Sequence, residues 1–193
     1  MSITFDHLNR SWNEFSQQIL GFIDTLGLSQ AQLDCDHVAL RVNSLETALQ
    51  LEQAFSKQGQ IISKNIINGR PIVIIALDTP LMLGGYAIGC VELPYPSEKV
   101  YPNEGWEHVE LVFNCQAKNC EELALALTGR FPTLKAILET PDTHTSSGDI
   151  KVKMSSPKGD KERLANPTIA LKQGNICVKI HTHHIKAIIA SEQ

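Results

Sequence analysis

The sequence predicts an α+β fold: two βαβββ modules forming a curved mixed sheet around a cavity, with an extra N-terminal helix. The first observation is a repeated segment, Asp36–Val42 and Glu107–Phe113, in which an acidic residue, a histidine and a valine open an alternating apolar run. The second is that a helix pattern and three further strand patterns follow each copy. We therefore interpret residues 1–193 as a single domain, with a first module over 36–93 and a second over 106–181.

The N-terminal segment 5–26 has the apolar periodicity of an amphipathic helix. Its apolar residues recur at steps of three and four, from Leu8 and Trp12 through to Leu26. Gly27 follows at a position where helices commonly end. We expect this helix to pack on the sheet and to lie outside any functional site.

In the first module, a strand over 36–42 is followed by a helix that Ser44 caps and that extends to about Gly59. The dipeptide Asn68-Gly69 is the strongest short signal for a hairpin turn, so the segments on either side of it should be paired strands. The expected bounds of the three later strands are 60–67, 71–77 and 86–93.

The second module repeats this order with one departure. A strand over 106–113 and a helix over 119–127 open it, as in the first module. The departure is the long, proline-interrupted segment 131–149, in which we expect a short extra element around 134–138. Three strands and a short terminal helix should complete the chain, over 150–154, 168–172, 176–181 and 185–190.

Composition excludes several classes of protein. A hydrophobic fraction of 42% is typical of a globular protein, and the net charge of −4 argues against a nucleic-acid partner. No apolar run approaches the roughly 20 residues of a membrane helix, and the N-terminus has no apolar signal region. The five cysteines form no C-x-x-C motif, which favours reduced thiols and a cytoplasmic location.

The polar faces of the strands could line one cavity if the two modules close against each other. Alternation places His37 and His108 on the polar faces of equivalent strands, and Glu92 on that of a fourth strand. Two imidazoles and one carboxylate can bind a divalent metal and leave positions open. Glu92 has apolar neighbours, so it should be paired or metal-bound. The alternative is a polar face turned to water, which antiparallel sheets often have.

Other ionisable residues share these faces. Glu110 is the candidate proton carrier. Lys179 either pairs with Glu92 or Glu110 in the metal-free protein, or lies just beyond the metal as an anion clamp or a base with a lowered pKa. Trp106 is in phase with His108 and Glu110, which favours a place at the cavity edge, and the alternative is a tryptophan packed in the core. The expected catalytic residues are thus Glu110 and Lys179, and the expected substrate-binding residues are Arg41, Trp106, Lys153 and His181.

Six short motifs spread over most of the chain carry a family resemblance. They are Asn68-Gly69-Arg70-Pro71-Ile72, Val91-Glu92-Leu93-Pro94, Tyr101-Pro102, Glu104-Gly105-Trp106-Glu107-His108, Ser155-Ser156-Pro157-Lys158-Gly159 and Asn166-Pro167-Thr168. Together they resemble the YecM family of bacterial proteins, within the vicinal oxygen chelate superfamily. That superfamily includes glyoxalase I, extradiol dioxygenases and bleomycin-resistance proteins.

The superfamily resemblance implies metal ligands on the first and fourth strands of each module. Those positions are His37, Glu92, His108 and Lys179 in this sequence. Lys179 departs from the pattern, because glutamate is common there and a protonated lysine cannot donate to a metal. Either three ligands suffice, or His181 or Glu110 contributes, or no metal is bound.

The resemblance implies a divalent metal (Fe, Zn, Ni or Mn) and no established reaction. The leading expectation is a cytoplasmic metal-dependent enzyme, resembling an isomerase, lyase or dioxygenase, that acts on a small anionic, oxygen-rich molecule. The second is a metal-free protein of the bleomycin-resistance type that sequesters a small molecule. The third is a structural or partner-binding protein whose polar concavity is only solvated.

Overall fold

A computed structural model describes residues 3–139, 144–145, 148–156 and 163–191 of the chain. Pro157, Lys158 and Gly159, which belong to one of the six family motifs, lie outside the described residues. Within the described residues, no helix combines the length and the apolar character needed to cross a membrane.

The first module has the predicted order of elements. Ser44 caps the helix as expected, because its hydroxyl accepts a hydrogen bond from the backbone N–H of Thr47. Asn68 and Gly69 both have positive φ, as a tight hairpin turn requires. The elements are β1 (Asp34–Arg41), α2 (Leu45–Phe55), β2 (Gly59–Ile67), β3 (Arg70–Leu83) and β4 (Tyr86–Pro94).

The second module repeats that order and adds a helix. The extra element expected around 134–138 is a helix, α4 (Pro132–Glu139), which packs against α3 (Cys120–Arg130). The main strands are β5 (Gly105–Val112), β8 (Lys151–Ser155), β9 (Thr168–Gln173) and β10 (Ile176–His181). The short strands β6 (His144–Thr145) and β7 (Gly148–Asp149) pair apart from them, and α5 (Ile185–Ala190) follows β10.

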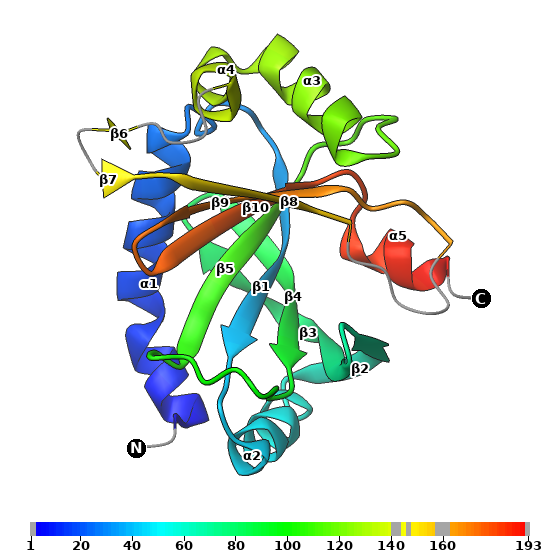
Figure 1. Cartoon of the computed structure of the whole chain (residues 1–193). Coiled ribbons are helices and arrows are strands. Elements are labelled where there is room, and N and C mark those ends of the chain that lie inside the picture. Colours follow the sequence, from blue (N-terminus) through cyan, green and yellow to red (C-terminus); the bar gives the residue numbers. More distant parts are fainter. Residues whose placement is uncertain (1–2, 140–143, 146–147, 157–162, 192–193) are drawn as a thin grey trace.

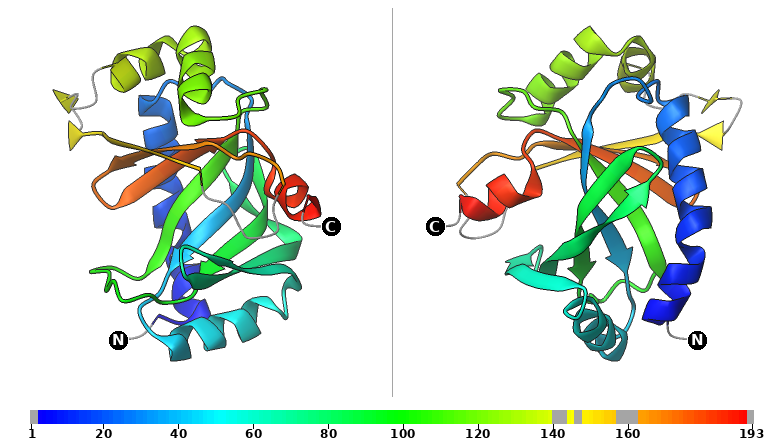
Figure 2. Two further views of the ribbon diagram at one scale, coloured as in Figure 1. Left: turned by 45° about the vertical axis from the view of Figure 1, so that its right-hand side comes forward. Right: turned by 180° about the vertical axis from the view of Figure 1, so that it is seen from behind.

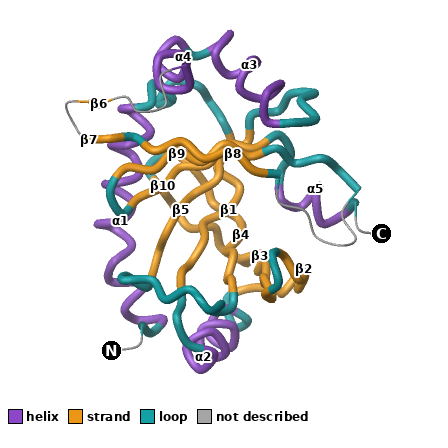
Figure 3. The backbone as a smooth tube through the Cα atoms, in the orientation of Figure 1, coloured by secondary structure: helices purple, strands orange, loops and turns teal. Residues whose placement is uncertain are grey.

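One eight-stranded mixed sheet joins the two modules, in the order β2-β3-β4-β1-β5-β10-β9-β8 (Figures 1 and 3). The modules meet at the antiparallel pair β1–β5. In each module the last strand returns parallel to the first, so β4 runs beside β1 and β10 beside β5. The predicted fold class is confirmed, and the repeated segments form the two central strands.

Helix α1 (Phe5–Thr25) runs along the sheet and packs against β5 and β10 (Figure 2). Its apolar stripe is buried, with Leu8, Ile19 and Phe22 almost fully inaccessible. These residues join the apolar face of the central strands in one core, which includes Val38 and Val109. The opposite face of β1 and β5 carries the histidines.

Two register shifts interrupt the pairing of β1 with β5. Cys35 pairs with Leu111 and His37 with Glu110, so Asp36 is an extra residue on β1. A β-bulge of this kind breaks the alternation of side chains between the two faces of a sheet. The side chain of Asp36 therefore lies with that of His37, which it contacts.

The second shift lies on β5, where Ala39 pairs with His108 and Leu40 with Trp106. Glu107 is the extra residue there, and it joins the histidine face. Each bulge therefore places an acidic residue beside the histidine that follows it.

The bulge at Glu107 also reverses the expected side of Trp106. Trp106 does not edge the cavity, because its indole lies among the core residues under α1. Its Nε1 donates a hydrogen bond to the carbonyl of Leu8 at 3.0 Å, and its ring packs edge-on against Trp12 at 4.9 Å between centroids. Strict alternation from His108 fails here because it assumes a strand without a bulge.

We expect Trp106→Ala to lower the free energy of unfolding by about 2–3 kcal/mol, since it removes a large, partly exposed core side chain. Urea denaturation followed by circular dichroism would measure this. Leu125→Ala, at an exposed position on α3, is the control and should change stability by less than about 0.5 kcal/mol. A Trp106→Ala protein as stable as the control would contradict this placement.

Candidate metal centre and its cavity

The histidine face of the sheet lines a cavity of about 550 Å³. Residues from both modules form it, from β1 and β4 on one side to β10, β9 and β8 on the other. Most residues expected at the site do line it, namely His37, Arg41, Glu92, His108, Glu110, Lys153 and Lys179.

A preceding carboxylate orients each histidine at the floor of the cavity. Asp36 Oδ1 lies 2.8 Å from His37 Nδ1, and a Glu107 oxygen makes the equivalent contact with His108 Nδ1. A carboxylate on one ring nitrogen fixes the ring and leaves the other nitrogen for a metal. The Nε2 atoms of both histidines therefore remain as potential ligands.

Those two Nε2 atoms converge on Glu110. Glu110 Oε1 lies 3.2 Å from His108 Nε2 and 3.5 Å from His37 Nε2. The ligand atoms of these three residues all lie within 4.8 Å of one another, as a metal ion would require. His37 Nε2 is buried and has no hydrogen-bond partner among the described residues. A buried polar atom without a partner is costly, so this one suggests a missing ligand.

Glu92 lies next to these three residues but farther from His37 than Glu110 does, with its Oε2 at 3.8 Å from His37 Nε2. It comes from β4, where its backbone pairs with that of Ala39. Glu110 is thus the carboxylate nearest both histidines, and Glu92 is a fourth candidate ligand. The third ligand expected from sequence was Glu92, with Glu110 considered only as a helper.

Lys179 occupies the position on β10 that Glu92 occupies on β4. Its backbone pairs with that of Glu110, two residues after His108, just as Glu92 pairs with Ala39, two residues after His37. Its ammonium donates to Glu110 Oε1 at 2.8 Å. The second module therefore has its carboxylate on β5 and a lysine on β10, whereas the first module has its carboxylate on β4.

His181 lies beneath the cavity floor and is fully buried. Its Nε2 is 3.3 Å from Asp36 Oδ2, and its Nδ1 is 3.5 Å from Glu110 Oε2. Asp36 Oδ2 also accepts a hydrogen bond from the backbone N–H of Ile185, at the start of α5. His181 therefore links the two buried carboxylates, and its expected contact with substrate is replaced by a supporting position.

Arg41 and Lys153 lie on the cavity wall. Arg41 is paired with Glu107, and its guanidinium lies 4.3 Å from the ring centroid of Tyr101. Lys153 comes from β8, on the far side of the cavity from Arg41 in the strand order.

Sequence reasoning missed Asp36 and Glu107. The available signal was the acidic residue directly before each repeated histidine. Strict alternation assigned both acids to the core face, and only the bulges bring them to the histidines.

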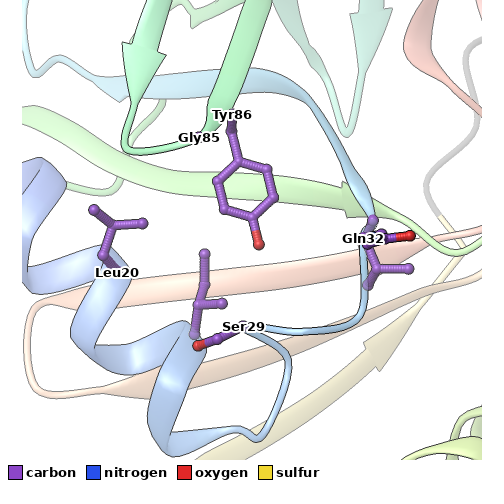
Figure 4. A pocket seen from close by; sticks show the side chains of 7 residues that line it. Leu20, Ser29, Gln32, Gly85 and Tyr86 are labelled. Carbon is purple, nitrogen blue, oxygen red and sulfur yellow. The ribbon is translucent and has the colours of Figure 1, made fainter.

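A second hollow, of about 370 Å³, lies between the end of α1 and the turn before β4 (Figure 4). Its described lining includes Leu20, Ser29, Gln32, Gly85 and Tyr86, and holds no histidine, carboxylate or lysine. The ionisable groups are concentrated in the larger cavity.

Comparison with known proteins agrees with the motif resemblance. The family model described as "YecM protein" matches residues 4–192. The chain belongs to the YecM family. The paired modules are the arrangement that its resemblance to the vicinal oxygen chelate superfamily implied.

Two relatives match most of the chain. Protein YecM of Escherichia coli (strain K12) is 40% identical over 168 residues, which cover 87% of this chain and 83% of that protein. An uncharacterized protein of Haemophilus influenzae is 33% identical, over 89% of this chain and 86% of its own length. A solved structure described as "Structural Genomics, Protein EC4020" is 33% identical, with a TM-score of 0.79 over 97% of this chain and 92% of that one.

Burial and neighbouring charges set the carboxylate pKa values at the floor of the YecM-family cavity. Burial by itself would raise the pKa of each acid, but the surrounding cations outweigh it. The His37 charge and hydrogen bonds from His181 and His37 hold the pKa of Asp36 well below its usual range. His108 and Arg41 lower the pKa of Glu107 to about 2, and Lys179 and His37 lower that of Glu110.

The histidines and the lysine shift in the opposite direction. Burial would lower the pKa of His37, but Asp36 and Glu110 raise it well above 6.5. Burial and Lys179 oppose protonation of His108, yet Glu107 and Glu110 raise its pKa overall. Burial likewise disfavours the charged form of Lys179, but Glu110 and Glu92 raise its pKa. The raised pKa and the contact with Glu110 agree with the expected salt bridge in the metal-free protein, whereas a base with a lowered pKa does not fit them.

We expect the metal-free protein to be most stable between about pH 5 and pH 6. The lowered pKa values of Asp36, Glu107 and Glu110 stabilise the fold above their ordinary values of 3.8 and 4.5, and this is lost as the pH falls through the folded-state values. The raised pKa values of His37 and His108 stabilise it below 6.5, and this is lost as the pH rises through their folded-state values. The profile of stability against pH therefore has an acidic limb, where stability falls with decreasing pH, and an alkaline limb, where it falls with increasing pH. Thermal denaturation in chelator at a series of pH values would measure both.

The double variant His37→Gln/His108→Gln should flatten the alkaline limb of that profile. His7→Gln, at an exposed position on α1, is the matched control and should leave the limb unchanged. An alkaline limb of wild-type steepness in the double variant would show that these two imidazoles do not produce it.

Proposed function

We propose that this protein is a metal-dependent enzyme that acts on a small anionic, oxygen-rich molecule. The observation that carries the proposal is the convergence of His37 Nε2, His108 Nε2 and Glu110, in which the buried His37 Nε2 has no hydrogen-bond partner among the described residues. The vicinal oxygen chelate resemblance suggests an isomerase, a lyase or a dioxygenase-like reaction.

The donor set fits a divalent first-row metal. Two imidazole nitrogens and a carboxylate suit iron, zinc, nickel or manganese, and Glu92 could add a second carboxylate. The carboxylates on the Nδ1 atoms strengthen this fit, because metal-binding histidines usually have such partners. When bound, the metal would polarise neighbouring oxygens of the substrate as a Lewis acid.

The chain's own residues would orient the substrate and hold protons. Lys179 stays charged, so its proposed role is to attract an anionic substrate group near Glu110. Glu110 stays ionised and can accept a proton on the oxygen that is not used as a ligand. His181 contacts that carboxylate from below and connects it to Asp36, which would keep both in place.

The charged groups around the two histidines balance one another in the absence of metal. Arg41, Lys179 and the two imidazoles, when protonated, oppose four carboxylates. A divalent ion bound to neutral imidazoles replaces the two imidazolium charges, so its binding should release protons. The carboxylates are Asp36, Glu92, Glu107 and Glu110.

Protein purified without chelator should contain close to one equivalent of a divalent metal, measured by elemental analysis. His37→Ala, His108→Ala and Glu110→Ala should each lower the metal affinity by at least about tenfold, because each removes a ligand. His7→Ala is the matched control, since His7 is exposed on α1 and lies outside the cavity. Wild-type metal content in all three variants, with folding confirmed by circular dichroism, would exclude this site.

The balance of charges around the histidines favours one alternative function. In this alternative, the protein holds no metal and binds a small anionic molecule, as proteins of the bleomycin-resistance type do. The Lys179–Glu110 ion pair supports it, because this pair leaves the floor neutral without a metal. Lack of metal in the purified protein, together with no uptake from added iron, zinc, nickel or manganese, would decide for the alternative.

We expect Lys179→Glu to raise the divalent-metal affinity by at least about tenfold, because it replaces a cation beside Glu110 with another possible ligand. The same change should destabilise the metal-free protein, since Glu110 loses its ammonium partner. Isothermal titration with zinc and thermal denaturation in chelator would measure the two effects. Lys179→Gln separates loss of the cation from gain of a ligand, and should give a smaller gain. Unchanged affinity in Lys179→Glu would show that this position lies outside the metal's reach.

A further inference from the structure

Two rows of paired residues cross the cavity face of the sheet from β8 to β5. In the first row, Lys151 pairs with Lys172, Lys172 with Cys177, and Cys177 with His108. Residues paired across neighbouring strands point to the same side of a sheet. Two lysines therefore lie on the same face as His108, at the outer end of its own row, and both line the cavity.

The second row is parallel to the first and ends at Glu110. Lys153 pairs with Ala170, Ala170 with Lys179, and Lys179 with Glu110. The small side chain of Ala170 separates the two lysines and leaves room above β9. Lys153 lies on the outer strand, as Lys151 does.

The outer lysines differ from the inner cations in their partners. Lys179 is neutralised by Glu110, and Arg41 by Glu107. Lys151, Lys153 and Lys172 form no ion pair with any residue that the structure describes. Among the described residues, therefore, no carboxylate neutralises the positive charge of this cavity wall.

The pairing of Lys151 with Lys172 is itself unfavourable. Like charges directly opposite each other on neighbouring strands destabilise a sheet. The two backbones are roughly 4.5–5.5 Å apart at such a pair, so both ammonium groups can reach one anion. A bound anion would convert the repulsion into an attraction.

We propose that Lys151, Lys153 and Lys172 bind the phosphate group of a small phosphorylated ligand. The proposal rests on the proposed function in taking this cavity as the ligand site, but it does not require the metal. Lysine binds phosphate as a point charge, whereas planar carboxylates are best matched by the arginine fork, which this wall lacks. Ser155 and Thr168 pair in the next row and also line the cavity, so hydroxyl groups lie near the same wall.

The position of the wall sets the shape of the ligand. Strands are about 4.8 Å apart, so β9 lies about 10 Å from β5 across the sheet. Lysine side chains reach over part of that distance. The ligand should therefore be elongated, with its phosphate at β8 and β9 and its other oxygens toward His37, His108 and Glu110.

Inorganic phosphate is the probe for this site, used with the full chain at low ionic strength and pH 7.5. Amide chemical shifts of Thr168–Gln173 in ¹⁵N-labelled protein should change saturably with phosphate and not with chloride at equal ionic strength. Lys151→Gln/Lys172→Gln should weaken phosphate binding by at least about tenfold, because two charge-assisted contacts are lost. Lys135→Gln, at an exposed position on α4 outside the cavity, is the matched control and should bind as wild type does.

Melting temperatures give a second test, because a purely structural role for these lysines would not make the effect of phosphate differ between wild type and variant. Without phosphate, Lys151→Gln should melt at a higher temperature than wild type, since it removes the like-charge pair. Saturating phosphate should raise the melting temperature of wild type more than that of the variant.

Three results would overturn the phosphate site: no saturable shift in wild type, unchanged binding in the double variant, or equal loss in Lys135→Gln. Metal content measured on the same preparations keeps the two proposals separate. Phosphate binding that depends on Lys151 and Lys172, in a protein that contains no metal and takes up no added iron, zinc, nickel or manganese, would support this site and reject the metal centre. Retained metal with unchanged phosphate binding in the double variant would reject this site alone.

Discussion

The interaction on which the site depends is the contact of each cavity histidine with the carboxylate directly before it. Asp36 and Glu107 reach His37 and His108 only because each acid is the extra residue of a β-bulge. Without the bulges, both acids would point into the apolar core, where an unpaired carboxylate is very costly. The bulges therefore protect the core, fix both imidazole rings, and direct the two free nitrogens toward Glu110.

The two modules share one plan but differ in how they supply charge. The first places Ala39 on its central strand and Glu92 on its last strand. The second places Glu110 and Lys179 at the corresponding positions, where they form an ion pair. This asymmetry gives the cavity a histidine-carboxylate floor with a lysine beside it. It also leaves the charges at the floor balanced without a metal.

Much of the fold follows from patterns in the sequence. The apolar periodicity of α1, the Ser44 cap and the Asn68-Gly69 turn each depend on neighbours along the chain, so local chemistry is enough to predict them. The duplication added the tertiary expectation that β1 and β5 are equivalent, and the sheet confirms it. Alternation failed at Trp106, since a bulge depends on how two strands pair and leaves little trace in either strand alone.

The sequence by itself determined which residues could do chemistry: His37 and His108 at repeated positions, carboxylates near them, and lysines on the late strands. Only the tertiary structure decided how they combine. Register between strands brought Glu110, rather than Glu92, nearest both imidazoles and set Lys179 against it. It placed His181 below the floor and lined up Lys151 with Lys172. The physical reason is that burial and distance fix ionisation and pairing, and both depend on strands far apart in the chain.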